Sequence, residues 1–155
     1  MPNTPYTGME DGTLRVTITL DGSAMNSLYG IQSIQVDHAL NKISTAEIVL
    51  RGEMELDSGS FPISDGSDFN PGVKIVVSAG YGESETATIF TGLIVKHIVE
   101  LTLENFYMLR IICKHESVKL TYQRKDGYFS KQKDSDIISS IFSDYGISPT
   151  VGATS

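Results

Sequence analysis

Residues 86–101, TATIFTGLIVKHIVEL, and residues 106–114, FYMLRIICK, decide the fold of this chain. Both runs are rich in β-branched and aromatic residues, which favour strands. The short connection between them predicts an antiparallel pair. Both runs are apolar on both faces, whereas an antiparallel sheet with one face in water alternates apolar and polar residues. The second face must therefore be covered by a helix, another domain or another subunit.

The spacing of the apolar residues divides each run into two faces. Phe90, Ile94 and Ile98 are separated by even numbers of residues, so they are expected to share one face of the first strand. Met108 and Ile112 share a face of the second strand by the same rule. We interpret these five side chains as candidates for contact with a neighbouring subunit.

Shorter strands flank this pair along the chain. Alternating or β-branched patterns predict strands over 13–20, 31–40, 44–50 and 73–79. The tight connection at Asn41 and Lys42 predicts that the second and third of these form a hairpin. Residues 51–72 are instead rich in Asp, Glu, Gly and Ser and predict a long acidic loop, which in a compact domain tends to be functional or disordered.

One helix is predicted near the end of the sequence. Asp134 or Ser135 can cap its first turn, and Gly146 can end it in a conformation that glycine adopts easily. Five apolar residues between these ends recur at helical spacing: Ile137, Ile138, Ile141, Phe142 and Tyr145. We therefore predict a mainly β domain over 1–130, followed by a helix and tail over 131–155 that begin the next, truncated domain.

Composition restricts the class of protein. The 155 residues include 12 Lys and Arg against 19 Asp and Glu, a net charge of −7, with 40% hydrophobic and 20% charged residues. These values are typical of one soluble globular domain. Neither a membrane-length apolar run nor a secretory leader is evident. A single cysteine, Cys113, excludes an internal disulfide framework.

The charge is unevenly distributed along the chain. Residues 1–109 contain 5 basic and 14 acidic side chains, whereas residues 110–155 contain 7 basic and 5 acidic ones. Tyr122, Tyr128 and Phe129 interleave with the basic residues, as in a surface that stacks single-stranded nucleic acid. The excess of two positive charges is too weak for that function, because phosphate binding needs clustered Lys and Arg. A solvated polar segment and a basic patch facing a partner both remain open, and we expect no nucleic-acid partner.

No catalytic or metal-binding pattern is evident. His38, His97 and His115 lack the spacing of metal ligands, and His38 and His97 are interpreted as hydrogen-bonded structural residues on strand faces. Cys113 lies in an apolar strand, which favours a buried thiol over a nucleophile. Phosphate-binding, dinucleotide and hydrolase motifs are absent. We therefore predict a protein that is not an enzyme, with no catalytic residue, no metal and no cofactor.

The order of several short motifs resembles the N-terminal hub region of VgrG (Rhs-element Vgr) proteins and of phage late-control protein D. The matching pieces begin with FNPGVKI at 69–75, GY at 80–81 and IFTGLI at 89–94. They continue with LRIICK at 109–114, VKLT at 118–121, DII at 136–138 and YGI at 145–147. Each piece alone has low specificity, and the resemblance rests on their order and spacing over a little more than half of the chain.

This resemblance implies a fold, a role and a set of partners. The fold is an antiparallel β-barrel of the tail-tube and hub type with a C-terminal helix. The role is that of a structural hub module in a contractile injection spike, of the type VI secretion or phage baseplate kind. The implied partners are two further copies in a homotrimer of the full-length protein, an Hcp-like tail-tube subunit, baseplate proteins and effectors.

The implied route out of the cell needs no signal peptide. The spike would be assembled in the bacterial cytoplasm and expelled by the apparatus, or would be part of the virion if the machine is a phage.

An alternative class is a stand-alone β-rich module that binds a ligand or carbohydrate, although the absence of Trp disfavours it. A hydrolase that uses the acidic loop is a further alternative, disfavoured because a loop holds paired carboxylates poorly.

Overall fold

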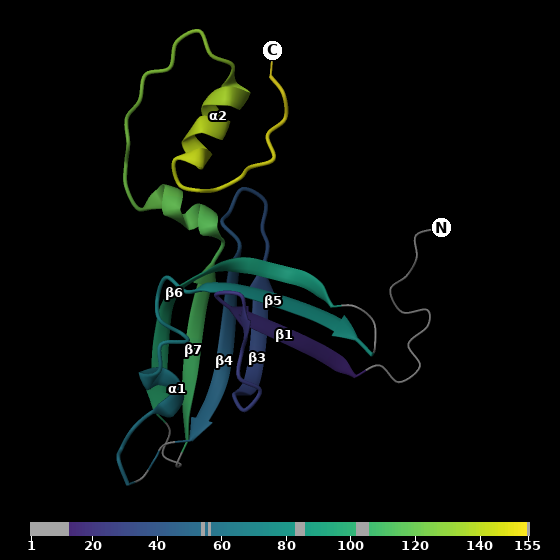
Figure 1. Cartoon of the computed structure of the whole chain (residues 1–155), viewed down its shortest axis with the longest axis vertical. Coiled ribbons are helices and arrows are strands. Elements are labelled where there is room, and N and C mark those ends of the chain that lie inside the picture. The colour runs from purple at the N-terminus through teal and green to yellow at the C-terminus, as the bar shows by residue number, and fades with distance from the viewer. Residues whose placement is uncertain (1–12, 54, 56, 83–85, 102–105, 155) are drawn as a thin grey trace.

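A single curled antiparallel sheet forms the body of the protein (Figure 1). The computed structural model describes residues 13–53, 55, 57–82, 86–101 and 106–154. Its sheet has seven strands in the order β2-β1-β5-β6-β7-β4-β3. The strands are β1 (Leu14–Leu20), β2 (Ser23–Ala24), β3 (Gly30–Asp37), β4 (Thr45–Glu53), β5 (Lys74–Tyr81), β6 (Ala87–Leu101) and β7 (Phe106–Lys114).

The predicted pairing of the two deciding runs is confirmed. Strands β6 and β7 are antiparallel neighbours, and β3 pairs with β4 as the hairpin prediction requires. The turn proposed between β6 and β7, residues 102–105, lies outside the described residues. The structure also contains elements that the sequence patterns did not indicate: the short strand β2, the helix α1 (Pro62–Asp65) and the 3-10 helix η1 (Glu116–Thr121).

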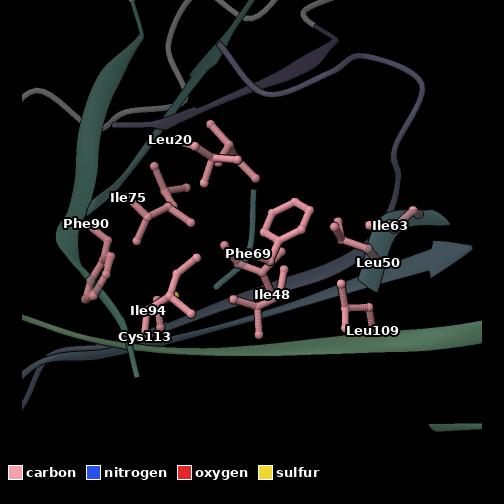
Figure 2. Close-up of a cluster of buried hydrophobic side chains, with 14 of the residues drawn as sticks. Leu20, Ile48, Leu50, Ile63, Phe69, Ile75, Phe90, Ile94, Leu109 and Cys113 are labelled. Atoms are coloured by element: carbon pink, nitrogen blue, oxygen red, sulfur yellow. The ribbon is translucent and has the colours of Figure 1, made fainter. Parts of the chain in front are cut away.

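The concave side of the sheet encloses one hydrophobic core. Alternate residues of β7, namely Tyr107, Leu109, Ile111 and Cys113, have no solvent exposure. Side chains from β1, β4, β5 and β6 meet them there, and Figure 2 shows how Leu20, Ile48, Ile75, Phe90 and Ile94 gather around Cys113 and Leu109. Ile63 and Phe69, from the connection between β4 and β5, also enter this core (Figure 2).

The sheet curls but does not close, so the expected β-barrel is open. Strand β2 covers only Thr19 and Leu20 of β1, and no strand pairing in the described part of the chain joins β1 to β3. A groove of about 360 Å³ separates these two edges, and its lining is mostly apolar: Leu14, Val16, Ile31, Ile34, Val36, Ala79 and Ile89 with Gln32 and Ser33. Alternation along a strand reports which face is buried, whereas closure depends on the twist and stagger of the whole sheet.

Two β-bulges in β6 set the direction of its side chains. Val77 pairs with Phe90 but Ser78 pairs with Thr88, so Ile89 is an extra residue opposite β5. Opposite β7, Ile94 pairs with Cys113 whereas Lys96 pairs with Ile112, so Val95 is extra. A bulge of this kind leaves one residue out of the ladder and shifts every later side chain to the other face.

The region 51–72, predicted as one long loop, is partly ordered by the core. Strand β4 continues to Glu53, and α1 follows at the lower end of the sheet (Figure 1). Gly52 lies opposite Tyr107 in the ladder, and the tyrosine ring occupies the space that a side chain on residue 52 would fill. The Tyr107 hydroxyl then accepts a hydrogen bond from the backbone N–H of Ile63, 2.9 Å away. The buried tyrosine thus fastens α1 to the sheet.

The C-terminal part forms a small lobe at the other end of the molecule (Figure 1). The predicted helix is present as α2 (Asp134–Ser143), and Gly146 beyond it has a positive φ of 68°. The expected cap was wrong: Lys133 is the N-cap residue, without a side-chain bond. Instead, the Thr154 hydroxyl oxygen in the tail accepts a hydrogen bond from the Ser135 N–H at 3.0 Å.

In the described part of the chain, no helix has the length and apolar character needed to cross a membrane.

Replacement of Gly52 by alanine should destabilise the fold. A Cβ at residue 52 would overlap the Tyr107 ring and lie 2.7 Å from its hydroxyl oxygen. The ring must move and lose its bond to Ile63, so we expect a loss of about 1–3 kcal/mol in the free energy of unfolding, as for other overpacked cores. Chemical denaturation followed by circular dichroism measures this loss.

Gly30→Ala is the matched control on the neighbouring strand. A Cβ at residue 30 would meet ordinary contacts of 3.5 Å and 3.9 Å with Arg51. Its effect should stay within about 0.5 kcal/mol, as is usual for surface substitutions. Equal stability of the two variants would contradict the packing described for Tyr107.

Candidate functional site

The five candidate interface residues do not share one face. Phe90 and Ile94 are 2% and 1% exposed and belong to the core, so the prediction that they contact a neighbouring subunit was wrong. The bulge at Val95 shifts Ile98 to the convex face, where it pairs with Arg110. Even spacing cannot place residues on one face across a bulge, because the extra residue reverses the alternation.

The remaining candidates lie together on the convex face of β6 and β7. Ile98, Met108 and Ile112 are partly exposed there, whereas their neighbours on β7 are fully buried. Met108 is flanked by Arg51 of β4 and Glu100 of β6, and Ile112 by Glu47 and Lys96. The convex face is therefore a mixed surface in which apolar side chains alternate with charged ones.

An arginine joins the three strands of this convex face. Arg110 of β7 donates hydrogen bonds to Glu47 on β4 and to Glu100 on β6, the latter at 3.0 Å. The hydrogen bond from Arg110 lowers the pKa of the Glu100 carboxyl, and the two carboxylates raise the pKa of the arginine. Arg110 neutralises one of the two carboxylate charges, so the network keeps a net charge of −1 and is less costly to cover with another protein than two unpaired carboxylates.

All three histidines form hydrogen bonds within the chain, as expected for His38 and His97. The ring nitrogens of His38 lie 2.9 Å from the Ser44 hydroxyl and 2.9 Å from the carbonyl oxygen of Ile89. That carbonyl belongs to a bulge residue, so His38 links the end of β3 to β6 beside the open groove. His97 lies 3.1 Å from the carbonyl oxygen of Phe69, and His115 caps η1 through Ser117.

The described residues offer no arrangement for catalysis that the sequence overlooked. No group of three or more His, Cys, Asp or Glu within them could hold a metal ion. Cys113 is fully buried, and burial raises the pKa of its thiol to about 12. A nucleophilic cysteine needs the opposite shift, since the thiolate is the reactive form. The candidate functional site in the described part of the chain is the convex face of β6 and β7.

Comparison with known proteins adds a family and a fold. The family model described as the Alg8 N-terminal domain matches residues 10–155. Among curated proteins, no match to this chain is found. The family that matches is thus not the VgrG family expected from the sequence motifs. The expected phage-tail type of fold is nevertheless supported.

That support comes from a solved structure, the 43 kDa tail protein of prophage MuSo2 from Shewanella oneidensis. The chain is similar to it with a TM-score of 0.56 and 14% sequence identity over 87% of this chain. The aligned part is 38% of the tail protein, so the chain spans well under half the length of that structure. At this level of identity the similarity establishes a shared fold.

Replacement of Arg110 by methionine should change how stability depends on pH. Glu100 has a pKa below its ordinary value of 4.5, so it stabilises the native state above that value, and this contribution is lost as the pH falls through the folded pKa. In Arg110→Met the Glu100 pKa should rise towards its ordinary value. The difference in unfolding free energy from the original protein should then be largest near neutral pH and shrink in acid.

An NMR titration of the Glu100 side chain measures this pKa directly. Arg124→Met is the matched control, because among the described residues Arg124 forms an ion pair only with Asp126, at 3.8 Å, where both side chains are 92% exposed. An unchanged Glu100 pKa in Arg110→Met would contradict the network described on the convex face.

The Cys113 thiol should be inert in the native protein. With a pKa of about 12, roughly one thiol in ten thousand is ionised at pH 8, whereas a free cysteine is ionised to an appreciable fraction. Labelling with a thiol reagent should be slower than in denatured protein by at least about a hundredfold. Native labelling as fast as denatured labelling would show that the thiol is accessible and reactive.

Proposed function

Because this chain belongs to the Alg8 N-terminal domain family and has the fold of a phage tail protein, we propose that it is a structural module of a contractile injection machine. Its place is the hub that connects the tail tube to the spike. The observation that carries this proposal is the fold similarity to the MuSo2 tail protein over 87% of the chain. A non-enzymatic role agrees with the buried, unreactive thiol and with the structural contacts of the histidines.

The motif resemblance supports a more specific assignment within such machines. Residues 89–94 and 109–114, which carry two of the motifs, form the centre of the sheet in β6 and β7. We assign the module to a VgrG-like or late-control-D-like hub that acts as a homotrimer. Its partners are an Hcp-like tube subunit, baseplate proteins and effectors, and assembly in the cytoplasm precedes export through the apparatus.

The convex face supplies the surface for the trimer contact. Ile98, Met108 and Ile112 present apolar atoms there, and a neighbouring subunit would remove them from water. Burial of apolar surface stabilises association by roughly 25 cal/mol for each Å². The ion pairs of Arg110 with Glu47 and Glu100 leave that network without a large unpaired charge on the same face.

Light scattering of the full-length protein tests the trimer, and pull-down of a tube subunit tests the role. The double variant Met108→Glu and Ile112→Glu should convert a trimer into monomers, because it places negative charges beside Glu100 and Glu47. Ser23→Glu with Ala24→Glu, on the exposed strand β2 at the far edge of the sheet, adds the same two charges away from β6 and β7, and as the matched control it should leave the trimer intact.

Two results would refute the proposal. A full-length protein that stays monomeric and captures no tube subunit has no role as a hub. A trimer that survives the double variant would show that the subunits meet through a different face. Binding of the isolated chain to a glycan array would instead favour the alternative of a carbohydrate-binding module.

A further inference from the structure

The segment between η1 and α2 presents an unusual combination of side chains to solvent. All of its residues from 122 to 133 are exposed, including Tyr122 at 67%, Tyr128 at 92% and Phe129 at 43%. The segment contains four basic residues against one acidic residue: Arg124, Lys125, Lys131 and Lys133 against Asp126. We define residues 122–133 as the basic–aromatic segment. Exposed aromatic rings beside arginine and lysine are typical of protein–protein contact surfaces.

The basic–aromatic segment is held by the C-terminal lobe and away from the sheet. The Lys125 ammonium lies 4.7 Å from the centre of the Tyr145 ring, just beyond α2. Lys131 and Lys133 form no ion pair with any described residue. The segment thus offers positive charges and rings that the described part of this chain does not use.

The other end of the molecule carries the opposite charge. Five exposed carboxylates follow one another between the end of β4 and the start of β5, and none forms an ion pair within the described residues: Glu53, Glu55, Asp57, Asp65 and Asp68. We define these five as the acidic end. In Figure 1, α1 and the end of β4 lie at the lower end of the long axis, whereas η1 and α2 lie at its upper end.

A cleft opens at the acidic end. It has a volume of about 610 Å³, and Leu28, Tyr29, Pro62, Ile63 and Glu53 are among the residues that line it. Leu28 is 87% exposed at its mouth. Arg51, the basic residue of the lining, is held over the Phe106 ring, 4.3 Å from the ring centre. A cleft of mixed polar and apolar lining, with the Glu53 carboxylate among its residues, suits an aromatic side chain that has a polar tip and is flanked by lysines.

We propose that the basic–aromatic segment of one copy docks on the acidic end of a second copy of this chain, with the Tyr128 ring in the cleft between Leu28 and Pro62. Lys131 and Lys133 then face Glu53 and Asp57. The two complementary surfaces lie at opposite ends of the molecule, so the contact is head-to-tail, and repeated contacts of this kind build a ring or a filament. The cleft shares Arg51 with the convex face, where Arg51 pairs with Met108, but the contact does not use Ile98, Met108 or Ile112.

Charge complementarity selects a second copy over a nucleic acid. The chain as a whole carries a net charge of −7, so a polyanion would be repelled by most of the molecule. A second copy instead offers the carboxylates that the lysines lack, beside a cleft of suitable lining. Binding of a single-stranded oligonucleotide to the basic–aromatic segment is the competing outcome of the test.

A charge swap tests the docking on the whole chain. The basic variant, Lys131→Glu with Lys133→Glu, and the acidic variant, Glu53→Lys with Asp57→Lys, replace only residues without an ion pair in the described structure. Sedimentation equilibrium at one fixed salt concentration should show self-association of the original chain. Each variant alone should associate at least about tenfold more weakly. Their equimolar mixture should recover association, because every contact between unlike copies is again complementary.

Two further variants separate the ring from the charges. Tyr128→Ala should weaken self-association by about tenfold or more while leaving the unfolding transition unchanged, because the side chain is 92% exposed. Lys42→Glu with Lys74→Glu changes the net charge as the basic variant does, but in the β3–β4 connection and at the start of β5, and should have little effect.

The proposal is overturned by any of three results. The original chain could remain monomeric at the concentrations used for NMR, or the mixture of swapped variants could stay dissociated. Alternatively, the original chain could bind an oligonucleotide through residues 122–133 without associating with itself. Loss of the trimer in Ile112→Glu alone would leave this contact unaffected, because Ile112 pairs with Glu47 and Lys96 and with no residue of the cleft. The failure of this proposal and that of the hub assignment can therefore be told apart.

Discussion

The complete burial of alternate side chains on β7 is the constraint on which the rest of the structure depends. Tyr107, Leu109, Ile111 and Cys113 exclude solvent only because the sheet curls around them and because α1 and Phe69 cover the remaining side. Strands β6 and β4 must flank β7 to supply the other walls of the core. The same alternation sends Met108, Arg110 and Ile112 outward, so the composition of the convex face follows directly from the packing of the core.

Much of this arrangement could be predicted from the sequence. The period of two in residues 106–114 predicts both the strand and its buried face, and the stop signal at Gly146 predicts where α2 ends. Closure of the sheet and the bulges could not be predicted, because both depend on the stagger of neighbouring strands rather than on any local pattern. The extra residue at Val95 is the reason that Ile98 faces outward while Ile94 faces the core.

The residues of the convex face and of the cleft at the acidic end could be predicted only in part, because both surfaces depend on how neighbouring strands are aligned. Apolar residues on both faces of β6 and β7 predict that a helix, another domain or another subunit covers the convex face, but they do not identify which side chains lie on it. The ion pairs that join Arg110 to Glu47 and Glu100 bring together residues from three strands, and a sequence contains no sign of that register. The cleft beside Glu53 likewise forms from the segments around Leu28 and Pro62, which are far apart along the chain.

Electron cryomicroscopy of a contractile injection particle that contains this chain's full-length protein tests the central proposal most directly, namely that the chain is a module of the tail hub. The account predicts density for its curled sheet at the junction of the tail tube and the spike, in three copies related by the axis of the particle. A junction of tube and spike that lacks this chain would contradict the account, as would density for it at the outer surface alone.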